Sequence, residues 1–213
     1  YYSRVASQVL RNRQCPMNLE EQHPPETAPA PGAFQGQLLI ATPVIGSGFF
    51  NRSLTYLCHH DADGAMGIVI NQHLDLALSD MLEHLDIESI SDLADCPVLA
   101  GGPVGTEQGF VLHRGDPEWE GSQSVGEDLS LTTSRDILCA LALGDGPEDY
   151  LVALGYAGWG PGQLEQEVSG NSWLTVPADR GILFQVATND KLTAAGKQLG
   201  IDIDLLTAQA GHA

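Results

Sequence analysis

Residues 150–167 read YLVALGYAGWGPGQLEQE, and this stretch decides the fold. Its first eight residues are almost all apolar, a pattern that predicts a central strand buried on both faces. Glycines and Pro161 follow, and the apolar spacing from Leu164 to Val168 predicts a helix that begins close to the proline. A strand buried on both faces needs partner strands at its edges and packed elements above and below, so the remaining chain must supply them.

The chain before residue 150 is rich in short strand patterns. Residues 53–60 and 65–71 are apolar or β-branched runs on either side of an Asp-Gly turn at 61–64, which predicts a β-hairpin. We expect further strands at residues 36–42, 96–102, 109–114, 122–126 and 129–133.

Helical spacing recurs in two places among these strands. Leucine and methionine return at helical intervals in residues 78–85, with Ser79 able to cap the start. A second helix is expected over residues 137–142, where Thr133 or Ser134 can supply the capping oxygen. An apolar run, a turn and a final helix at residues 191–199 complete the chain. Because strands and helices interleave without strict alternation, we predict a single α+β domain.

The domain is expected to start at Phe34. Residues 20–33, EEQHPPETAPAPGA, hold closely spaced prolines and little to bury, so residues 1–33 are predicted to be a disordered leader and residues 34–213 the domain. We interpret residues 1–16 as upstream or artificially added sequence, because Met17 could open the reading frame.

The charge balance is strongly acidic. Nine Lys and Arg face 28 Asp and Glu, a net charge of −19. Three of the cations lie in the first sixteen residues, where there is no acid, so residues 17–213 carry −22. Between Arg52 and Arg114 there is no Lys or Arg, although ten acids fall there. Phosphate backbones and anionic lipids bind clustered cations, so neither nucleic acid nor a membrane is an expected partner.

The sequence carries no sign of secretion or of membrane insertion. Its four cysteines are isolated, without a C-x-x-C pair, which is typical of free thiols in a reducing compartment. No run of about 18 apolar residues is present, and the arginines near the start do not suit a signal peptide. We therefore expect a cytoplasmic protein.

Residues 58–63, CHHDAD, are the densest group of metal-ligand side chains. On a regular strand Cys58 and His60 point to one face and His59 to the other, so only two ligands are sure to converge. A metal site needs three or four ligands. We favour a core position for Cys58 and a hydrogen-bonded His60 at the strand end, and we expect no metal or cofactor.

Two further segments could contact an anion. Glycines at 155, 158, 160 and 162 lie between a strand and a helix, but the P-loop spacing and its lysine are absent, so we favour tight packing. In the segment 132–136, TTSRD, Arg135 is one of six cations after Met17 and a candidate anion contact. Capping of the following helix together with a local Arg–Asp pair explains the same segment without a ligand, and we favour this interpretation. No G-x-S-x-G elbow supports Ser134 as a nucleophile.

Several of these segments together resemble the bacterial YqgE/AlgH family. The resemblance runs from about Gly36 to Ala213. The matching words are GQLLIATP, FFNRSLTYLCHH, DGAMGIVIN, PVLAGGPV, GFVLHR, LTTSRDIL, YLVALGYAGWGPGQLEQE, NSWLTVPAD and AGHA. The resemblance implies a single domain in which a bifurcated, mostly antiparallel sheet curls into a pseudo-barrel flanked by helices. One branch of the family is named as a regulator of alginate biosynthesis, and the resemblance brings no catalytic residues.

Two functions are open at this point. The first is a regulatory protein that acts on gene expression indirectly, through a protein partner, and the absence of catalytic motifs favours it over an enzyme. The alternative is an enzyme or small-molecule-binding protein whose pocket is built from the Thr133–Asp136 helix start, the Gly101–Pro103 turn and the Trp159–Glu165 loop. Its candidate residues are Gly101, Gly102, Thr133, Ser134, Arg135, Asp136, Trp159 and Glu165.

Overall fold

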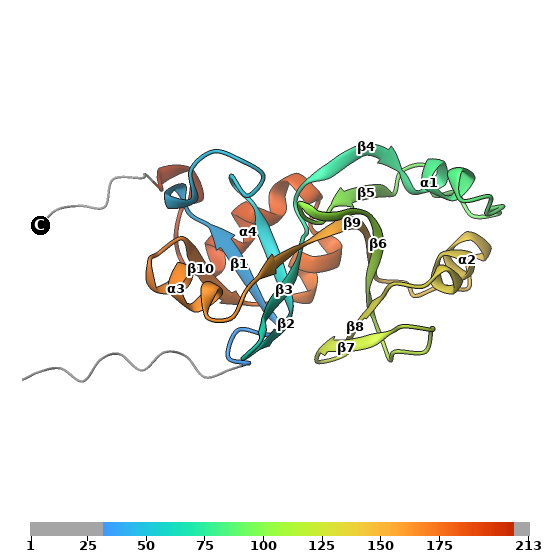
Figure 1. The fold of residues 1–213 in the computed structure, drawn as a ribbon. Helices are drawn as coiled ribbons and strands as arrows, with labels where there is room; N and C mark the ends of the chain where they lie inside the picture. Colours follow the sequence, from blue (N-terminus) through green and yellow to red (C-terminus); the bar gives the residue numbers. More distant parts are fainter. Residues whose placement is uncertain (1–31, 207–213) are drawn as a thin grey trace, which may run out of the picture.

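Strand β9 (Tyr150–Trp159) runs through the middle of the molecule, as its apolar sequence predicts (Figure 1). The structure is a computed structural model that describes residues 32–206. The other strands of this range are β1 (Gln37–Ala41), β2 (Leu54–Asp61), β3 (Gly64–Val69), β4 (His73–Ala77), β5 (Pro97–Ala100), β6 (Val104–Arg114), β7 (Gln123–Gly126), β8 (Leu129–Thr132) and β10 (Trp173–Pro177). The helices are α1 (Leu78–His84), α2 (Arg135–Leu143), α3 (Gln163–Ser169) and α4 (Lys191–Gln198).

These strands form one sheet that divides at β9. The order is β10-β1-β2-β3-β9-β6-β8-β7, with β5 also paired to β9 and β4 paired to β5. Strand β3 pairs with the last residues of β9, 157–159, whereas β5 pairs with residues 152–154. The β5–β9 pair is parallel and the others are antiparallel. The predicted α+β domain with a bifurcated, curled and mostly antiparallel sheet is therefore confirmed.

Glycines allow the backbone to cross closely where the sheet divides. Gly155 has φ +74°, and a Cβ there would lie 2.4 Å from the carbonyl oxygen of Gly102. A Cβ on Gly102 would lie 1.9 Å from the carbonyl carbon of Tyr156. Real Cβ atoms do not approach other heavy atoms this closely, so the turn between β5 and β6 needs glycine to pass β9. Gly155 was expected to allow tight packing of a strand against a helix, but its close contact is with the turn between β5 and β6.

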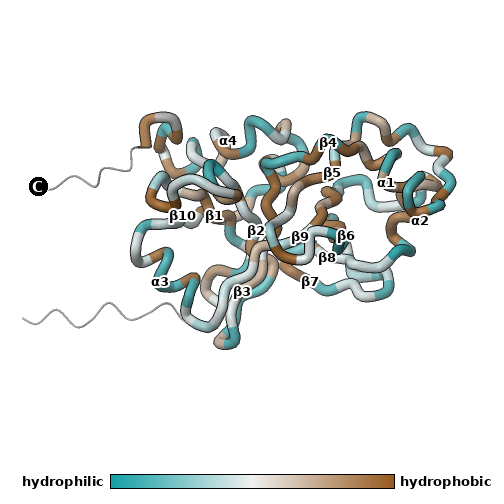
Figure 2. The backbone as a smooth tube through the Cα atoms, turned by 45° about the horizontal axis from the view of Figure 1, so that its top comes forward, coloured by the Kyte–Doolittle hydropathy of each residue, from teal (hydrophilic) through white to brown (hydrophobic). Residues whose placement is uncertain are grey.

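The division of the sheet produces two lobes joined by β9 (Figure 1). The first lobe contains β1, β2, β3, β10, α3 and α4, on the left of Figure 1. The second lobe contains β4 to β8, α1 and α2, on the right. Figure 2 shows hydrophobic segments along the strands of both lobes and hydrophilic segments in outer loops. The curled sheet forms a half-barrel, and each lobe adds a pair of helices to it.

Strand β9 contributes side chains to three hydrophobic clusters. Val152 packs with α1 and α2 in the second lobe, and Ala153 packs in the large cluster inside the curled sheet. Ala157 and Trp159 belong to the cluster of the first lobe, next to α3. Burial of an aliphatic or aromatic side chain contributes about 1.5–3 kcal/mol. Because one strand joins the three clusters, their packing is linked through it.

The helix starts differ from the sequence prediction in their capping groups. Ser79 does not cap α1, since the N-cap position is Ala77, whose amide donates to Asp80 Oδ2 at 3.4 Å. Ser134 is the N-cap of α2, as predicted, but its hydroxyl does not bond a helix amide. Asp136 Oδ1 accepts from its neighbour's amide, Ile137 N, at 2.9 Å instead. In α2 an aspartate carboxylate thus accepts the helix amide bond expected of a serine, whereas in α1 the carboxylate bonds only the amide of the N-cap residue.

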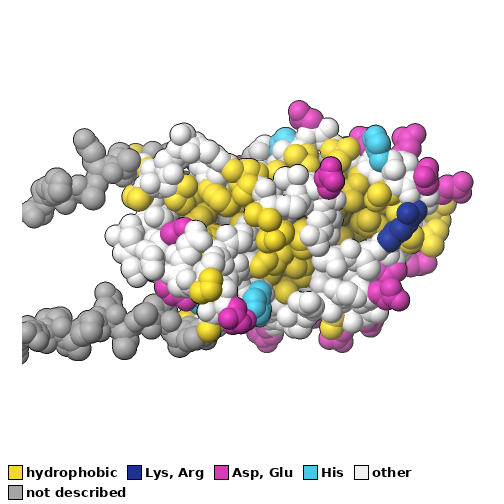
Figure 3. Space-filling model, viewed as in Figure 1, with side chains coloured by type: hydrophobic (Ala, Val, Ile, Leu, Met, Phe, Trp, Pro, Cys, Tyr) yellow, Lys and Arg dark blue, Asp and Glu magenta, His cyan; other side chains and the backbone are white. Residues whose placement is uncertain are grey.

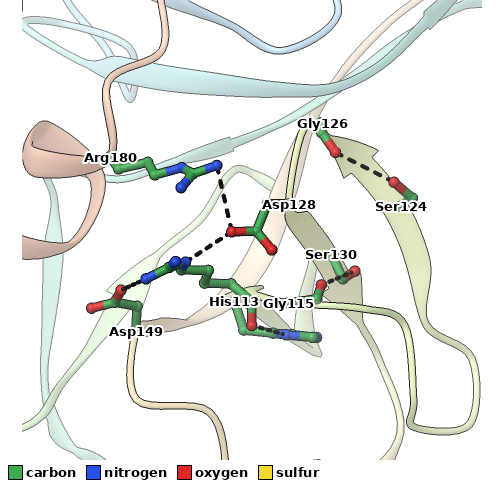
Figure 4. A network of polar contacts seen from close by, with 9 residues as sticks. His113, Gly115, Ser124, Gly126, Asp128, Ser130, Asp149 and Arg180 are labelled. Atoms are coloured by element: carbon green, nitrogen blue, oxygen red, sulfur yellow. Dashed lines mark hydrogen bonds and ion pairs between the residues drawn. The ribbon is translucent and has the colours of Figure 1, made fainter.

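An ion-pair network connects the two lobes (Figure 4). Asp128, in the turn between β7 and β8, accepts from Arg114 Nε at 2.8 Å and lies 3.4 Å from Arg180 Nη2. Arg180 follows β10, so this contact joins the first lobe to the second. The three side chains are 38–50% exposed, and exposed ion pairs contribute little stability. The network therefore links the two lobes but adds little to their stability.

Some expectations fall outside the described residues. Nearly all of the predicted leader, including Cys15, precedes residue 32. Between residues 32 and 206 there is no helix with the length and apolar composition to cross a bilayer. The cysteines of this range, Cys58, Cys96 and Cys139, are free thiols, as expected.

Candidate functional site

A cleft of about 180 Å³ lies between α1, α2 and the sheet of the second lobe. We call it the α1–α2 cleft. Its apolar lining comes from both helices and from two central strands: Met81, Leu85, Phe110, Val111, Leu138, Val152 and Leu154. Its polar lining includes Glu107 together with three residues predicted from sequence, Thr133, Ser134 and Arg135. An apolar body with few polar groups is the usual composition of a ligand pocket.

Arg135 fastens the start of α2 to the end of α1. Its Nη2 donates to the carbonyl oxygen of Leu85 at 2.6 Å and to that of Asp86 at 3.4 Å. These carbonyls lie where α1 ends, and a cation is favoured at a helix C-terminus. Among the described residues, Arg135 makes no ion pair with a carboxylate, so the predicted local Arg–Asp pair was wrong: the guanidinium bonds the end of α1, and Asp136 bonds amides instead. The guanidinium charge at this cleft is therefore bound by carbonyl dipoles alone.

Asp136, in contrast, is directed away from the cleft. Its carboxylate accepts from the amides of Glu120 and Ile137, each at 2.9 Å, and from the Ser134 hydroxyl. Partial burial raises its pKa, but these hydrogen bonds outweigh the effect, so the pKa lies below its usual value. The Ser134 Oγ also lies within hydrogen-bond distance of the carbonyl oxygen of Glu120, so its single proton is shared between the two acceptors. This pair of residues therefore anchors the loop before β7 onto the start of α2.

Trp159 and Glu165 lie in the first lobe, far along β9 from the cleft. Glu165 Oε1 lies 2.9 Å from His60 Nε2, and His60 is 3% exposed. Burial opposes ionisation of Glu165, but hydrogen bonds from its own amide and from His60 keep its pKa below the usual value. Trp159 Nε1 donates to Glu167 Oε2 at 2.9 Å. These two side chains form part of the interior of the first lobe.

The three predicted segments consequently do not form one pocket. Thr133, Ser134 and Arg135 line the α1–α2 cleft, whereas Trp159 lines a separate hollow of about 260 Å³ with Phe50 and Trp173. Gly101 and Gly102 lie against β9 where the sheet divides. Of the candidate residues, only the segment at the start of α2 remains together at a cavity.

Cys58 and His60 lie on different faces of β2. A β-bulge shifts the register of β2 against β3 between Leu57 and His59. Cys58 therefore packs in the cluster inside the sheet, while His60 stacks on Phe34 at a ring distance of 5.2 Å. The prediction that these two side chains share a face was wrong, because it assumed regular alternation. The described residues contain no group of three His, Cys, Asp or Glu that could hold a metal.

Two functional candidates were missed at the sequence level. Glu167 accepts from the indoles of Trp159 and Trp173, at 2.9 and 2.7 Å, and from Gln163 Nε2 at 2.8 Å. Lys191 is 2% exposed and lines a cavity between the lobes. Lys191 lies four residues before the buried Ala195, so helical spacing places both on the same face. This spacing was the sequence pattern that could have predicted burial of Lys191.

Both the sequence and the fold of this chain are similar to those of known proteins. A model of the family described as AlgH-like matches residues 38–204. The solution structure of the AlgH protein from Pseudomonas aeruginosa is similar, with a TM-score of 0.70 and 45% identity, over 84% of this chain and 95% of that one. A crystal structure of a Corynebacterium diphtheriae protein, at 20% identity and a TM-score of 0.53, shares the fold.

Several relatives match this chain over almost their full length. A UPF0301 protein of Saccharophagus degradans is 51% identical over 193 residues, which cover 91% of this chain and 95% of the relative. A UPF0301 protein of Thioalkalivibrio sulfidiphilus is 53% identical over 180 residues, which cover 84% of this chain and 97% of the relative. The match spans both lobes and the dividing strand β9. The chain therefore belongs to the AlgH-like family.

Proposed function

We propose that this protein acts on gene expression indirectly, by binding a basic, amphipathic segment of a partner protein at the outer end of the second lobe. The observation that carries the proposal is a group of exposed apolar side chains at that end. Leu85, Ile90 and Leu143 are 37%, 81% and 53% exposed. We call these three residues the apolar tip.

The apolar tip has a fixed backbone. The loop that follows α1 is attached to both ends of α2. Arg135 bonds the carbonyls of Leu85 and Asp86 at one end, and the amides of Ile90 and Ser91 donate to the carbonyl oxygen of Ala142 at the other, at 3.0 and 3.2 Å. The apolar tip therefore follows the length of α2. A preorganised apolar surface loses less entropy on binding than a mobile loop does.

The surroundings of the apolar tip are acidic. Exposed carboxylates follow the same loop and both ends of α2: Asp86, Glu88, Asp92, Asp136 and Asp145. Figure 3 shows Asp and Glu side chains gathered around this end of the molecule. No Lys or Arg occurs between Arg52 and Arg114, so Arg135 is the nearby cation. An apolar stripe with an acidic rim is complementary to a helix with one apolar face and Lys or Arg at its edges.

The same charge argues against direct DNA binding. Sequence-specific binding to duplex DNA relies on several Lys or Arg contacts to phosphates. The described range holds six cations, and two of them, Arg114 and Arg180, already pair with Asp128. A role in gene expression through a protein partner agrees with this charge better than operator binding does.

A designed peptide tests the proposal without knowledge of the partner. The probe is an amphipathic helix of about four turns with Leu on one face and Lys on the others, and its affinity is measured by calorimetry. We expect Ile90→Ser with Leu143→Ser to weaken binding about tenfold or more, because both side chains would lie near the centre of the interface. Binding should also weaken in about 1 M salt.

Val44→Ser is the matched control, since Val44 is 54% exposed in the first lobe. This control should bind the peptide as the unmodified protein does. Equal loss in the control and in the double variant would contradict the proposal. A sequence-specific, salt-dependent shift of a promoter fragment by the pure protein would contradict the indirect role.

A second candidate function is supported by the α1–α2 cleft. Arg135, which pairs with no carboxylate of residues 32–206, lies beside this apolar cavity and suits a small carboxylate with an apolar body. Glu107 in the same lining repels a negative charge, so the ligand's carboxylate would have to bind at Arg135. Thermal-shift measurements with medium-chain fatty acids and aryl carboxylates test it. We expect ligands that raise the melting temperature of the unmodified protein to lose most of this effect in Arg135→Gln, while Arg52→Gln retains it. Equal stabilisation of both variants would exclude the cleft.

A further inference from the structure

A second cavity, of about 510 Å³, lies between the lobes. We call it the interlobe cavity. One wall comes from the second lobe and β9, with Cys96, Leu99 and Tyr150 among its residues. The other wall is the segment 184–188 and Lys191 at the start of α4, in the first lobe. Its volume is within the range of small-molecule sites, and sites often form where two structural units meet.

Lys191 is the unusual group in this cavity. It is 2% exposed, and its Nζ donates to the carbonyl oxygen of Leu183 at 2.6 Å. It makes no ion pair with a carboxylate of the described residues. Burial disfavours the charged form, which lowers the pKa of Lys191 to about 8. A larger fraction of the amine is therefore neutral near neutral pH than in an exposed lysine.

The other titratable groups of the cavity lie on the opposite wall. Asp95 and Cys96 precede β5, and Glu148 and Tyr150 lie at the start of β9. The Cys96 thiol and the Tyr150 hydroxyl are 3.5 Å apart, and burial raises the pKa of Tyr150. The segment 184–188 and Leu78 of α1 contribute no titratable group. The lysine thus faces a wall that holds neutral donors and two carboxylates.

We propose that Lys191 is a nucleophilic amine that forms an imine with a small aldehyde or ketone bound in the interlobe cavity. The proposal goes beyond partner binding at the apolar tip and is independent of it. Neutral buried lysines are the amines that proteins use for such bonds. The Asp95 and Glu148 carboxylates disfavour an anionic carbonyl compound, so the ligand class is neutral or cationic.

The reaction balances without a further reactant. The nitrogen lone pair of neutral Lys191 attacks the carbonyl carbon, a C–N bond forms, and the carbonyl oxygen takes up the π electrons. The two amine protons leave with that oxygen as water when the C=N bond forms. No electron is gained or lost overall, so neither an oxidant nor a reductant is required. The imine remains open to hydrolysis by the reverse path.

The lysine content makes the test direct. The chain has two lysines, Lys191 and Lys197, and Lys197 is exposed on the same helix. The full chain is treated with propanal and sodium cyanoborohydride, which reduces an imine to a stable secondary amine. Peptide mapping by mass spectrometry then gives the labelling rate at each lysine separately from the N-terminal amine. We expect Lys191 to be labelled about tenfold or more faster than Lys197 at neutral pH, with its rate rising through pH 8.

Lys191→Arg and Lys197→Arg complete the experiment. Arginine retains a donor for the Leu183 carbonyl but cannot form the imine, so Lys191→Arg should fold and lose the fast label. Lys197→Arg should retain it. If the Lys191 variant does not fold, the rate ratio in the unmodified chain decides alone. Labelling of Lys191 that is absent, slower than that of Lys197 or equal to it would overturn the proposal.

Discussion

The two lobes differ in how their functional candidates are placed. In the first lobe, two glutamates bond buried or partly buried groups: Glu167 accepts from two indoles, and Glu165 bonds the buried His60, although the hydroxyls of Ser53 and Thr55 on β2 and just before it are buried without a partner. In the second lobe, the apolar tip is exposed to solvent, and Arg135 contacts carbonyls without a carboxylate partner among the described residues. The carboxylates of the first lobe are therefore used in its interior, whereas the second lobe has a group of apolar side chains on its surface that is suited to binding. Strand β9 joins the two.

The largest expected effect is at the point where the lobes meet. A Cβ at Gly102 would lie within 2.4 Å of backbone atoms of Tyr156 and Ala157, which cannot move without breaking β9. We expect Gly102→Ala to destabilise the protein by more than about 4 kcal/mol or to prevent folding. Gly160→Ala is the matched control, since its Cβ would meet only Gln163 Oε1 at 3.8 Å. Urea unfolding measures both, and equal stabilities would contradict the close crossing.

A smaller effect is expected inside the first lobe. Glu167→Ala removes the acceptor of three donors, Trp159 Nε1, Trp173 Nε1 and Gln163 Nε2. The Gln163 amide is exposed and can bond water instead, but the two indole donors are partly buried, and a donor that loses its partner there costs about 1–3 kcal/mol. We therefore expect a loss of about 2 kcal/mol in the free energy of unfolding. The exposed Glu118 provides the control, and Glu118→Ala should change stability by less than about 0.5 kcal/mol. A tolerated Glu167→Ala would remove the contrast between the lobes.

The smallest effect is a pH dependence in the second lobe. His113 is fully buried, and its Nε2 lies 2.9 Å from Thr132 Oγ1. Burial lowers its pKa, so the unfolded chain takes up a proton first as the pH falls below 6.5. The free energy of unfolding should therefore decrease from about pH 6.5 to 5, a range above the ordinary carboxyl pKa values. His113→Gln should flatten this slope, whereas the same change at the exposed His84 should not. An unchanged slope in His113→Gln would assign the dependence to another group.

Much of the fold could be predicted because it depends on local sequence patterns, such as apolar runs, and on motifs shared with a known family. The apolar run of residues 150–157 predicted β9, and the family words predicted the divided sheet. The predicted pocket of three segments could not be tested from sequence, because it depends on how close residues far apart in the sequence lie in the fold. Val152 and Leu154 of β9 line the α1–α2 cleft, whereas Trp159 is the last residue of β9, five residues or about 17 Å beyond Leu154. The bulge next to Cys58 left no sequence signal that distinguished it from a regular strand.

The most direct test of the proposed function maps where the basic amphipathic peptide binds. Amide chemical shifts of the full chain are followed during a titration with the peptide. We expect the largest changes at residues 85–91 and 139–143, with little change around Val44 in the first lobe. Changes centred on the first lobe, or no saturable change at the apolar tip, would contradict the proposed function.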